Sequence, residues 1–589
     1  MRRFIVGLFA LIGFFAVLAA AGVVLLIGKA LPTRAALPGT IVLTADLTRG
    51  LDEGPGQDPL MSLIAGNKPT LRDFLDGLER GGADPRVKGI YARVGDDVFG
   101  LAKAQELRDA IRAFRAQGKF AIAFADSFGE FGPGTRPYYL ASAFDEIWLQ
   151  PMGLVGLTGL YAQVPFFKGT LDWLGITPSF DHRSEYKTAM NTLTETRMTA
   201  PHREEVEALV SSMAGQIVRG IAESRNLTEP EVRSAIDRGP FFADEAQQAH
   251  LVDRLGYRDE AVARARERAG SGAELVSLAT YLDDAGRPHE SGPAIALIYG
   301  TGLIQRDASS GGLLAGEGEM SAQAVARAFR AALRDSEVRA ILFRIDSPGG
   351  SVVASETIWR EVGRARERGK PVIVSMSDLA GSGGYYIAAP ADKIVAEPAS
   401  LTGSIGVVAG KLVLGGLLDK LGVSTDSAQF GANAGMFDET TDFSPSAHQR
   451  LEDFLDRIYQ GFKSHVAAGR HMTADQVEAV AKGRVWTGEE ARTRGLVDEL
   501  GGYAVALRLA KEAAKIAGDA PFKIVVYPRR EPASERIFNR LLGREGEPDS
   551  GASSSLGGAI GLVDPLLRRL AALGRDPALL LMPPLPDPR

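Results

Sequence analysis

The sequence predicts an α/β protein built from two copies of one domain and preceded by a single membrane-spanning helix. Three observations point to this class. Short β-branched runs alternate with polar-faced helical runs, the alternation recurs later in the chain, and a long uncharged apolar run lies near the N-terminus. The first two predict parallel βαβ units with right-handed crossovers. The third predicts a transmembrane helix.

The apolar run covers Phe4 to Gly28, which is 25 residues without a charge. About 20 apolar residues in a helix cross the core of a bilayer. Arg2 and Arg3 favour a cytoplasmic N-terminus by the positive-inside rule. Ala19–Ala21 could serve as a signal-peptide cleavage site, but the length of the run favours an uncleaved anchor. We expect a single-pass protein of a bacterial inner membrane, with its bulk in the periplasm.

Two long stretches of the remaining chain resemble each other. Asp84–Ile90 parallels Asp335–Ile341, and each is followed by a helical run, Leu101–Gln117 in the first copy and Ser351–Arg368 in the second. Further matches lie at a constant offset of 247 positions, among them Tyr138–Ala141 with Tyr385–Ala388, and Leu174–Ile176 with Leu421–Val423. Such self-similarity indicates a tandem duplication of an α/β domain.

Four segments follow from this comparison. Residues 1–38 are the expected anchor and linker, residues 39–282 the first copy, residues 290–527 the second copy, and residues 528–589 a flexible tail. The tail contains a Gly/Ser-rich part typical of disorder. Its apolar stretch Ala578–Leu585 is far too short to span a membrane. That stretch could contact the membrane surface or a neighbouring subunit, or remain unstructured.

Composition excludes several kinds of site. The net charge is −6 and no basic cluster stands out, which argues against nucleic acid as a partner. The chain contains no cysteine, so disulfides, thiol catalysis and cysteine-based metal sites are excluded. We expect neither a metal nor another cofactor.

Ser382 is the candidate nucleophile, because it lies within Gly381–Gly384 between a predicted strand and a predicted helix. Glycines at such a turn permit a sharp backbone that lifts the serine Oγ out of the sheet. The alternative is a Gly-rich turn in which Ser382 only caps the helix. In the first copy the corresponding residue is Thr135, followed by Arg136 and Pro137. The first copy has therefore lost the Gly-rich loop, which favours the catalytic interpretation.

A serine needs a base, and Lys187 is the candidate. It lies where the second copy has Ala434, so each copy would supply one half of a catalytic pair. Burial can lower the pKa of a lysine enough for general-base catalysis, although a surface lysine is the plainer interpretation. His182 is the one histidine near a candidate site, so a Ser–His pair stays open. Ser404 could orient the lysine or satisfy its own turn.

The backbone N–H groups of Gly349 and Gly383 are the candidate oxyanion donors. Gly349 belongs to Asp346–Ser351, a turn after a strand that we expect to neighbour the Ser382 strand. A phosphate-binding loop is the alternative for this glycine pair, but the lysine and the spacing of such loops are absent.

Taken together, Asp346–Ser351, Gly381–Ile387 and Leu401–Gly406 resemble the long form of signal peptide peptidase A, also called the protease IV family. The resemblance implies a ClpP/crotonase-like fold for each copy and a homo-oligomer, a tetramer in this family. It also implies a Ser/Lys dyad and a membrane-anchored serine endopeptidase that degrades remnant signal peptides, which are hydrophobic. Carried over, Ser382 would be the nucleophile, Lys187 the base and Ser404 the partner of the lysine.

The sequence leaves two other function classes open. A catalytically inactive scaffold or chaperone could use the same fold, but the intact Gly-rich loops of the second copy argue against it. Acyl-CoA chemistry on a crotonase-like site would need a nucleotide-binding surface, and the N-terminal apolar run argues against that.

Overall fold

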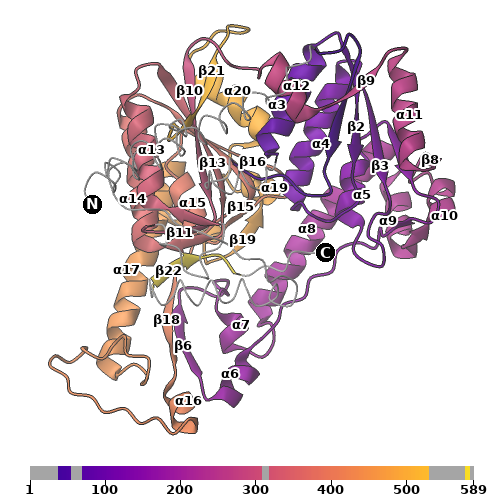
Figure 1. Ribbon diagram of the computed structural model, residues 1–589. Helices are drawn as coiled ribbons and strands as arrows, with labels where there is room; N and C mark the ends of the chain where they lie inside the picture. The colour runs from indigo at the N-terminus through magenta and orange to yellow at the C-terminus, as the bar shows by residue number, and fades with distance from the viewer. Residues whose placement is uncertain (1–36, 55–68, 308–317, 530–577, 584–589) are drawn as a thin grey trace, which may run out of the picture.

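The computed structural model describes residues 37–54, 69–307, 318–529 and 578–583 (Figure 1). The predicted transmembrane helix at Phe4–Gly28 and most of the predicted tail lie outside these ranges. Within them, none of the helices is long and apolar enough to cross a membrane.

The first half of the chain forms a parallel sheet whose strands run in the order β8, β4, β3, β2, β1 and β9. These strands are β1 (Ile41–Asp46), β2 (Val87–Arg93), β3 (Phe120–Ala125), β4 (Glu146–Leu149), β8 (Arg254–Leu255) and β9 (Glu274–Ser277). One face packs against α3 (Leu71–Ala83), α4 (Leu101–Ala116), α5 (Thr135–Ala141) and α12 (Leu278–Ala285), and the other against α11 (Arg258–Ala269).

The second half repeats this order. Its parallel strands are β21 (Lys523–Tyr527), β10 (Ala294–Thr301), β13 (Val338–Ser347), β15 (Val372–Gly381), β16 (Lys393–Ala396) and β20 (Glu499–Leu500). β15 pairs with β16 along its first part, and its C-terminal end pairs with β17 (Leu401–Gly403). β17 in turn pairs antiparallel with β19 (Val485–Thr487). The identical strand order in the two halves confirms that the fold is α/β with a duplicated parallel sheet.

Helices cover both faces of the second sheet as well. One face packs against α13 (Ala322–Arg334), α14 (Val352–Glu367), α15 (Gly383–Ala388) and α17 (Pro445–Arg470), and the other against α20 (Tyr503–Ala513). The amphipathic pattern explains this placement, since α13 buries Val325, Phe329 and Leu333 at helical spacing. Its first turn is capped by the Ser321 side chain, which accepts from the Ala324 N–H. Shorter helices complete the second half: α16 (Gly415–Lys420), α18 (Ala474–Val480) and α19 (Gly488–Thr493).

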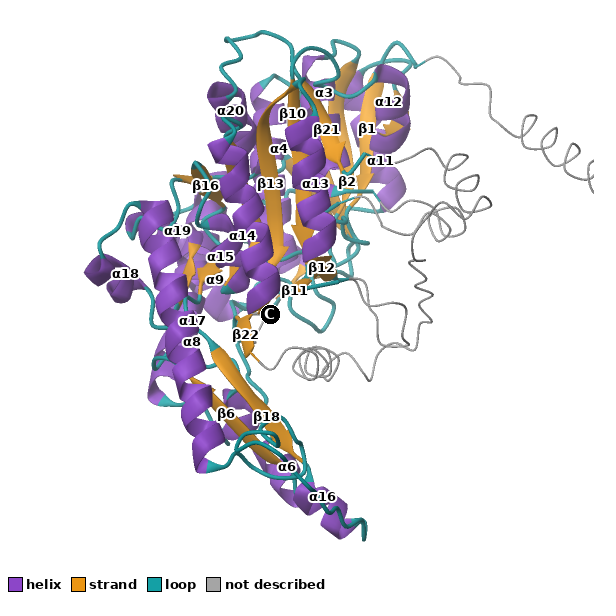
Figure 2. Cartoon of the chain, turned by 90° about the vertical axis from the view of Figure 1, so that its left-hand side faces the viewer, coloured by secondary structure: helices purple, strands orange, loops and turns teal. Residues whose placement is uncertain are grey.

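A third sheet joins the two halves. Its strands run in the order β12 (Glu319–Ser321), β11 (Leu303–Gln305), β14 (Gly349–Ser351), β22 (Ala578–Leu581), β18 (Val408–Val413) and β6 (Thr177–His182). β6 belongs to the first half and pairs antiparallel with β18 of the second. These two strands run together through the arm at the bottom of Figure 2, whose tip carries α16 and α6 (Lys168–Leu174).

β22 is a departure from the flexible tail predicted for residues 528–589. Instead of remaining unstructured, Ala578–Leu581 pairs with β14 on one side and β18 on the other. The side chains of Leu579 and Leu581 are buried, which supplies the apolar contact that holds the strand in place.

Charged side chains also connect the halves. Lys103 on α4 of the first half places Nζ 2.8 Å from Asp346 Oδ2 of the second. One turn later, Glu106 accepts from the buried guanidinium of Arg344 at 2.7 Å. Because breaking a buried pair leaves an uncompensated charge, these contacts fix α4 against the second sheet.

The first half has further elements outside these sheets. They are β5 (Leu154–Val155), β7 (Phe241–Phe242), α7 (Asn191–Thr194), α8 (Ala200–Arg225), α9 (Glu229–Arg238) and α10 (Ala243–Gln248). Of these, α8 packs against β19 of the second half.

Candidate active site

Ser382 lies where the sequence predicts, at the turn between β15 and α15. Its backbone has φ 54° and ψ −112°, a conformation that a residue with a side chain adopts only under strain. The turn is held by the Ser382 N–H, which donates to the Gly403 carbonyl at 2.8 Å. Ser382 stands at the N-cap position of α15, yet its side chain makes no capping hydrogen bond. The capping interpretation is therefore wrong, and Oγ is left for another partner.

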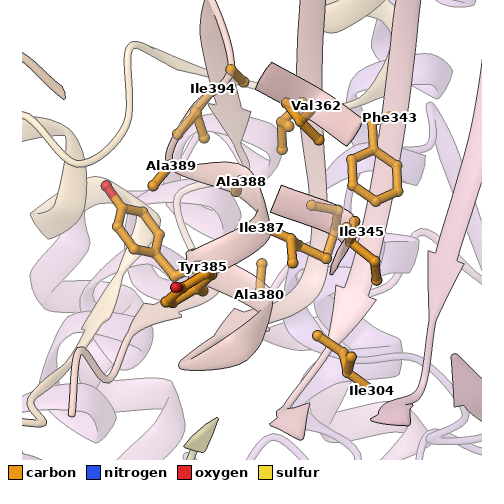
Figure 3. Close-up of a cluster of buried hydrophobic side chains, with 14 of the residues drawn as sticks. Ile304, Phe343, Ile345, Val362, Ala380, Tyr385, Ile387, Ala388, Ala389 and Ile394 are labelled. Carbon is orange, nitrogen blue, oxygen red and sulfur yellow. The ribbon is translucent and has the colours of Figure 1, made fainter. Parts of the chain in front are cut away.

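The helix that follows this turn, α15, is tightly packed in the apolar core. Figure 3 shows Tyr385, Ile387 and Ala388 of α15 among apolar side chains from the neighbouring strands and helices. The Tyr385 hydroxyl donates to the Leu496 carbonyl at 3.0 Å. Because such a core resists local movement, it holds the strained turn in one position.

The partner of Ser382 Oγ is Lys187. In the pairing of β6 with β18, His182 lies opposite Val408, and the chain then turns inward toward the second half. Lys187 Nζ lies 2.7 Å from Ser382 Oγ, and both residues are fully buried. The two predicted members of the pair therefore meet within one chain, although 195 positions separate them.

Ser404 is the other predicted residue in contact with the lysine. Its Oγ lies 3.0 Å from Lys187 Nζ, and its carbonyl oxygen lies 2.8 Å from the same atom. Ser404 follows β17, whose pairing with β15 sets Gly403 opposite Gly381. Its own backbone is left-handed, with φ 50°, and its N–H donates to the Arg484 carbonyl. Two acceptors on one residue thus orient the amine toward Ser382.

Two glycines that the sequence did not point to, Gly406 and Gly483, leave the space that Lys187 occupies. A methyl group on Gly406 would lie 3.0 Å from Lys187 Cδ, and one on Gly483 would lie 2.5 Å from the Lys187 backbone nitrogen. The Gly483 N–H also donates to the Ile405 carbonyl at 2.9 Å. Lys187 is therefore enclosed by backbone on both sides. Gly406 ends the motif Leu401–Gly406 and could have been noticed, whereas Gly483 carries no sequence signal.

His182, the alternative base, is not at the site. Its side chain is exposed, and Nδ1 lies 2.9 Å from the Ser184 carbonyl oxygen. The Ser–His arrangement that the sequence left open is therefore not formed in this structure.

The predicted oxyanion donors lie against each other beside Ser382. A methyl group on Gly383 would lie 3.1 Å from Gly349 Cα and 2.8 Å from Ser355 Oγ, so no larger residue fits there. Gly383 is the first residue of α15, where backbone N–H groups lack acceptors within the helix. The Gly349 N–H donates to Ser347 Oγ at 3.2 Å. The expected adjacency of their strands is confirmed, since β13 pairs with β15.

The corresponding place in the first half is filled. Thr135, which aligns with Ser382, is buried and donates from Oγ1 to the Gly159 carbonyl at 2.9 Å. The next residue, Arg136, forms an ion pair with Asp97 at 2.7 Å. This pair joins the two first-half loops that correspond to the Ser382 and Gly349 loops of the second half. The first half instead contributes Lys187 to the site of the second half.

Glu205 on α8 is a further buried group near the lysine. Its Oε1 accepts from the Val485 N–H at 2.7 Å, whereas Oε2 has no hydrogen-bond partner among the described residues. Burial raises the pKa of this carboxyl to about 8, against the lowering effect of the Val485 N–H. Glu205 is then mostly protonated at pH 7 and carries little negative charge that would favour the ammonium form of Lys187.

We expect Glu205→Gln to remove one source of pH-dependent stability. The folded protein keeps the Glu205 proton up to about pH 8, whereas the unfolded chain releases it near 4.5. The folded state therefore binds more protons between these values, and the free energy of unfolding falls as pH rises through this window. Thermal unfolding from pH 5 to 9 should show a shallower decline for the variant. Identical slopes for the two proteins would contradict the assignment.

The chain is similar to known peptidases along most of its length. The model of "Peptidase family S49" matches residues 114–271 and 364–517, one segment in each half. "Serine protease SPPA, chloroplastic" of Arabidopsis thaliana is 31% identical over 488 residues, covering 80% of this chain and 70% of that protein. "Protease 4" of Salmonella typhi is 31% identical over 76% of this chain and 72% of that protein. "Protease 4" of Haemophilus influenzae is 30% identical over 77% of this chain and 75% of that protein.

Proposed function

The chain belongs to peptidase family S49, and we propose that it is a membrane-anchored serine endopeptidase that degrades remnant signal peptides. The observation that carries the proposal is the buried contact of 2.7 Å between Lys187 Nζ and Ser382 Oγ. A serine hydroxyl is a weak nucleophile until a base takes its proton, and a hydrogen-bonded amine in its neutral form can do so.

The proposed reaction begins when Ser382 Oγ attacks the carbonyl carbon of a peptide bond and its proton passes to Lys187 Nζ. The carbonyl electrons move to the oxygen, and the N–H groups of Gly383 and Gly349 stabilise the resulting oxyanion. For this, the Gly349 N–H exchanges its contact with Ser347 Oγ for the oxyanion. When the intermediate collapses, the carbon–nitrogen bond breaks and Lys187 gives its proton to the leaving amine.

Water completes the cycle. It attacks the ester between the substrate acyl group and Ser382, and Lys187 accepts a proton from it. The second collapse returns a proton to Ser382 Oγ and releases the acid product. Throughout, the hydroxyl and carbonyl oxygens of Ser404 keep Nζ directed at Ser382.

The uncharged run Phe4–Gly28 would anchor the protein in a bacterial inner membrane with its catalytic part in the periplasm. Each half would adopt a ClpP/crotonase-like fold, and four copies would assemble into a tetramer. The substrates would be hydrophobic peptides, because the side chains beside the dyad, among them Ala189, Met190 and Val408, form an apolar cluster.

Hydrolysis of an apolar fluorogenic peptide by the detergent-solubilised full chain tests the proposal. Turnover should be present in the wild type and lost in Ser382→Ala, with both proteins folded to the same extent by circular dichroism. His182→Ala should keep wild-type turnover, because its ring does not reach Ser382 Oγ. If Ser382→Ala hydrolyses the peptide as fast as the wild type, Ser382 is not the nucleophile of a peptidase, and the inactive scaffold becomes the better interpretation.

A further inference from the structure

The strand β22 lies beside the dyad between the edges of β14 and β18, in the manner of a bound peptide, and the space that it fills between these edges is called the groove below. It pairs antiparallel with β14, placing Leu581 opposite Gly349 and Leu579 opposite Ser351. On its other edge it pairs antiparallel with β18, with Leu579 opposite Val408. After the strand, the Met582 N–H donates to the Pro348 carbonyl at 2.8 Å. Main-chain pairing of this kind is how sheet edges bind extended peptides.

The end of this segment lies next to the nucleophile. A methyl group on Gly381, the residue before Ser382, would collide with the side chain of Met582. Met582 is 3% exposed and packs with Leu209 and Val485. Val485 is the residue whose N–H binds the Glu205 carboxyl near Lys187. A substrate could not pass along β14 to Ser382 while Met582 is in place.

The side chains of the segment also fit the groove. Leu579 and Leu581 are 1% and 0% exposed, and they cluster with Ala189, Met190 and Val408. Ala189 and Met190 follow Lys187 closely in sequence, so part of the apolar surface around Leu579 and Leu581 comes from the segment that carries the proposed base. The occupant is therefore extended and apolar, which are the properties that the proposed substrates would have.

We propose that Ala578–Pro583 is an internal competitor of the substrate, which must leave the groove before another peptide can be cleaved. The effect on substrate cleavage rests on the proposed function, whereas the binding of the segment to the groove does not depend on turnover. Because the segment belongs to the same chain as its groove, its binding there is intramolecular and is not diluted as that of a free peptide is. Bound in this way, it lowers the fraction of chains that can accept substrate.

The test compares the full chain with a variant lacking residues 578–589, both in detergent and with the apolar fluorogenic peptide as substrate. Deletion should raise kcat/KM about tenfold, corresponding to a groove that is free in about a tenth of full-length chains. A variant lacking only residues 584–589 keeps β22 and should behave as the wild type. Leu581→Asp in the full chain should also raise kcat/KM, because a carboxylate is costly in that buried position.

Binding is measured separately, with Ser382→Ala in the chain that lacks residues 578–589. A fluorescently labelled peptide with the sequence Ala578–Pro583 should bind to this protein and bind at least tenfold more weakly to Ser382→Ala in the full chain. Binding without turnover in any active-serine variant would sustain the inference and refute the proposed function. If the shortened chain is folded but neither binds the peptide nor gains activity, β22 is a structural strand and the inference is overturned.

Discussion

Replacing Lys187 by methionine should lower kcat/KM for an apolar peptide by about 10³-fold, within the range attributed to a general base. Methionine fills a similar volume and suits irregular buried space, so the fold should survive. The amine that receives the Ser382 proton would be gone, while Ser404 Oγ and its carbonyl would lose their donor. Unpaired buried acceptors cost about 1–3 kcal/mol, which should appear as a lower Tm.

Lys187→Arg should be just as inactive, for a different reason. A guanidinium stays protonated in proteins and cannot accept a proton from Ser382. A guanidinium is also bulkier than the amine, and the Gly406 backbone lies close to the lysine side chain, since a methyl group on Gly406 would be 3.0 Å from Lys187 Cδ. An Arg variant with more than a tenth of wild-type kcat/KM would show that Lys187 supplies only positive charge.

Lys482→Met is the matched control for both variants. This lysine lies on a neighbouring segment, but it is exposed and its ion pair with Glu185 spans 3.2 Å at the surface. Solvent screening makes an exposed pair of this kind contribute little to stability. Wild-type activity in Lys482→Met beside inactive Lys187→Met would assign the loss to the buried amine and not to a general loss of lysine.

The features that could be predicted from the sequence are local or repeated. The turn at Ser382 was predictable because glycine, strand and helix signals occur within a few residues, and the helix at Leu101–Gln117 was predictable from its apolar spacing. It forms α4 at Leu101–Ala116. Lys187 is further removed, and the comparison of the two copies singled it out. The copies differ at Ser382 and at Lys187 in opposite directions, which no single motif would reveal.

What the sequence could not supply depends on strand edges and burial created by distant segments. Glu205 stands in a charged run on a helix, and its burial depends on distant segments such as β19, whose Val485 N–H donates to its carboxyl group. β22 forms only because β14 and β18 each present an edge to it, and both lie more than 150 positions earlier in the chain. A short apolar stretch in a polar tail gives no sign of which edges will receive it.

Gly483→Ala should reduce kcat/KM by about 100-fold, although Gly483 touches no reacting atom. Its φ is +79°, and a methyl group there would lie 2.5 Å from the Lys187 nitrogen and 2.7 Å from its Cα. Both are backbone atoms, so the loop carrying Lys187 must move. A shift of about 1 Å at a catalytic group can cost this factor.

Gly422→Ala separates this effect from backbone strain, because Gly422 has a similar φ of +73° and nothing within 4 Å of the added methyl group. Both variants bear the left-handed penalty of about 1 kcal/mol, so both should unfold at a slightly lower temperature than the wild type. The collision with Lys187 is confined to Gly483→Ala, and so should be the loss of turnover. Equal kcat/KM in the two variants would mean that the Lys187 loop yields without displacing Nζ from Ser382 Oγ. Reduced activity in Gly483→Ala alone would show that the close fit of Gly483 against the Lys187 backbone sets the position of the base.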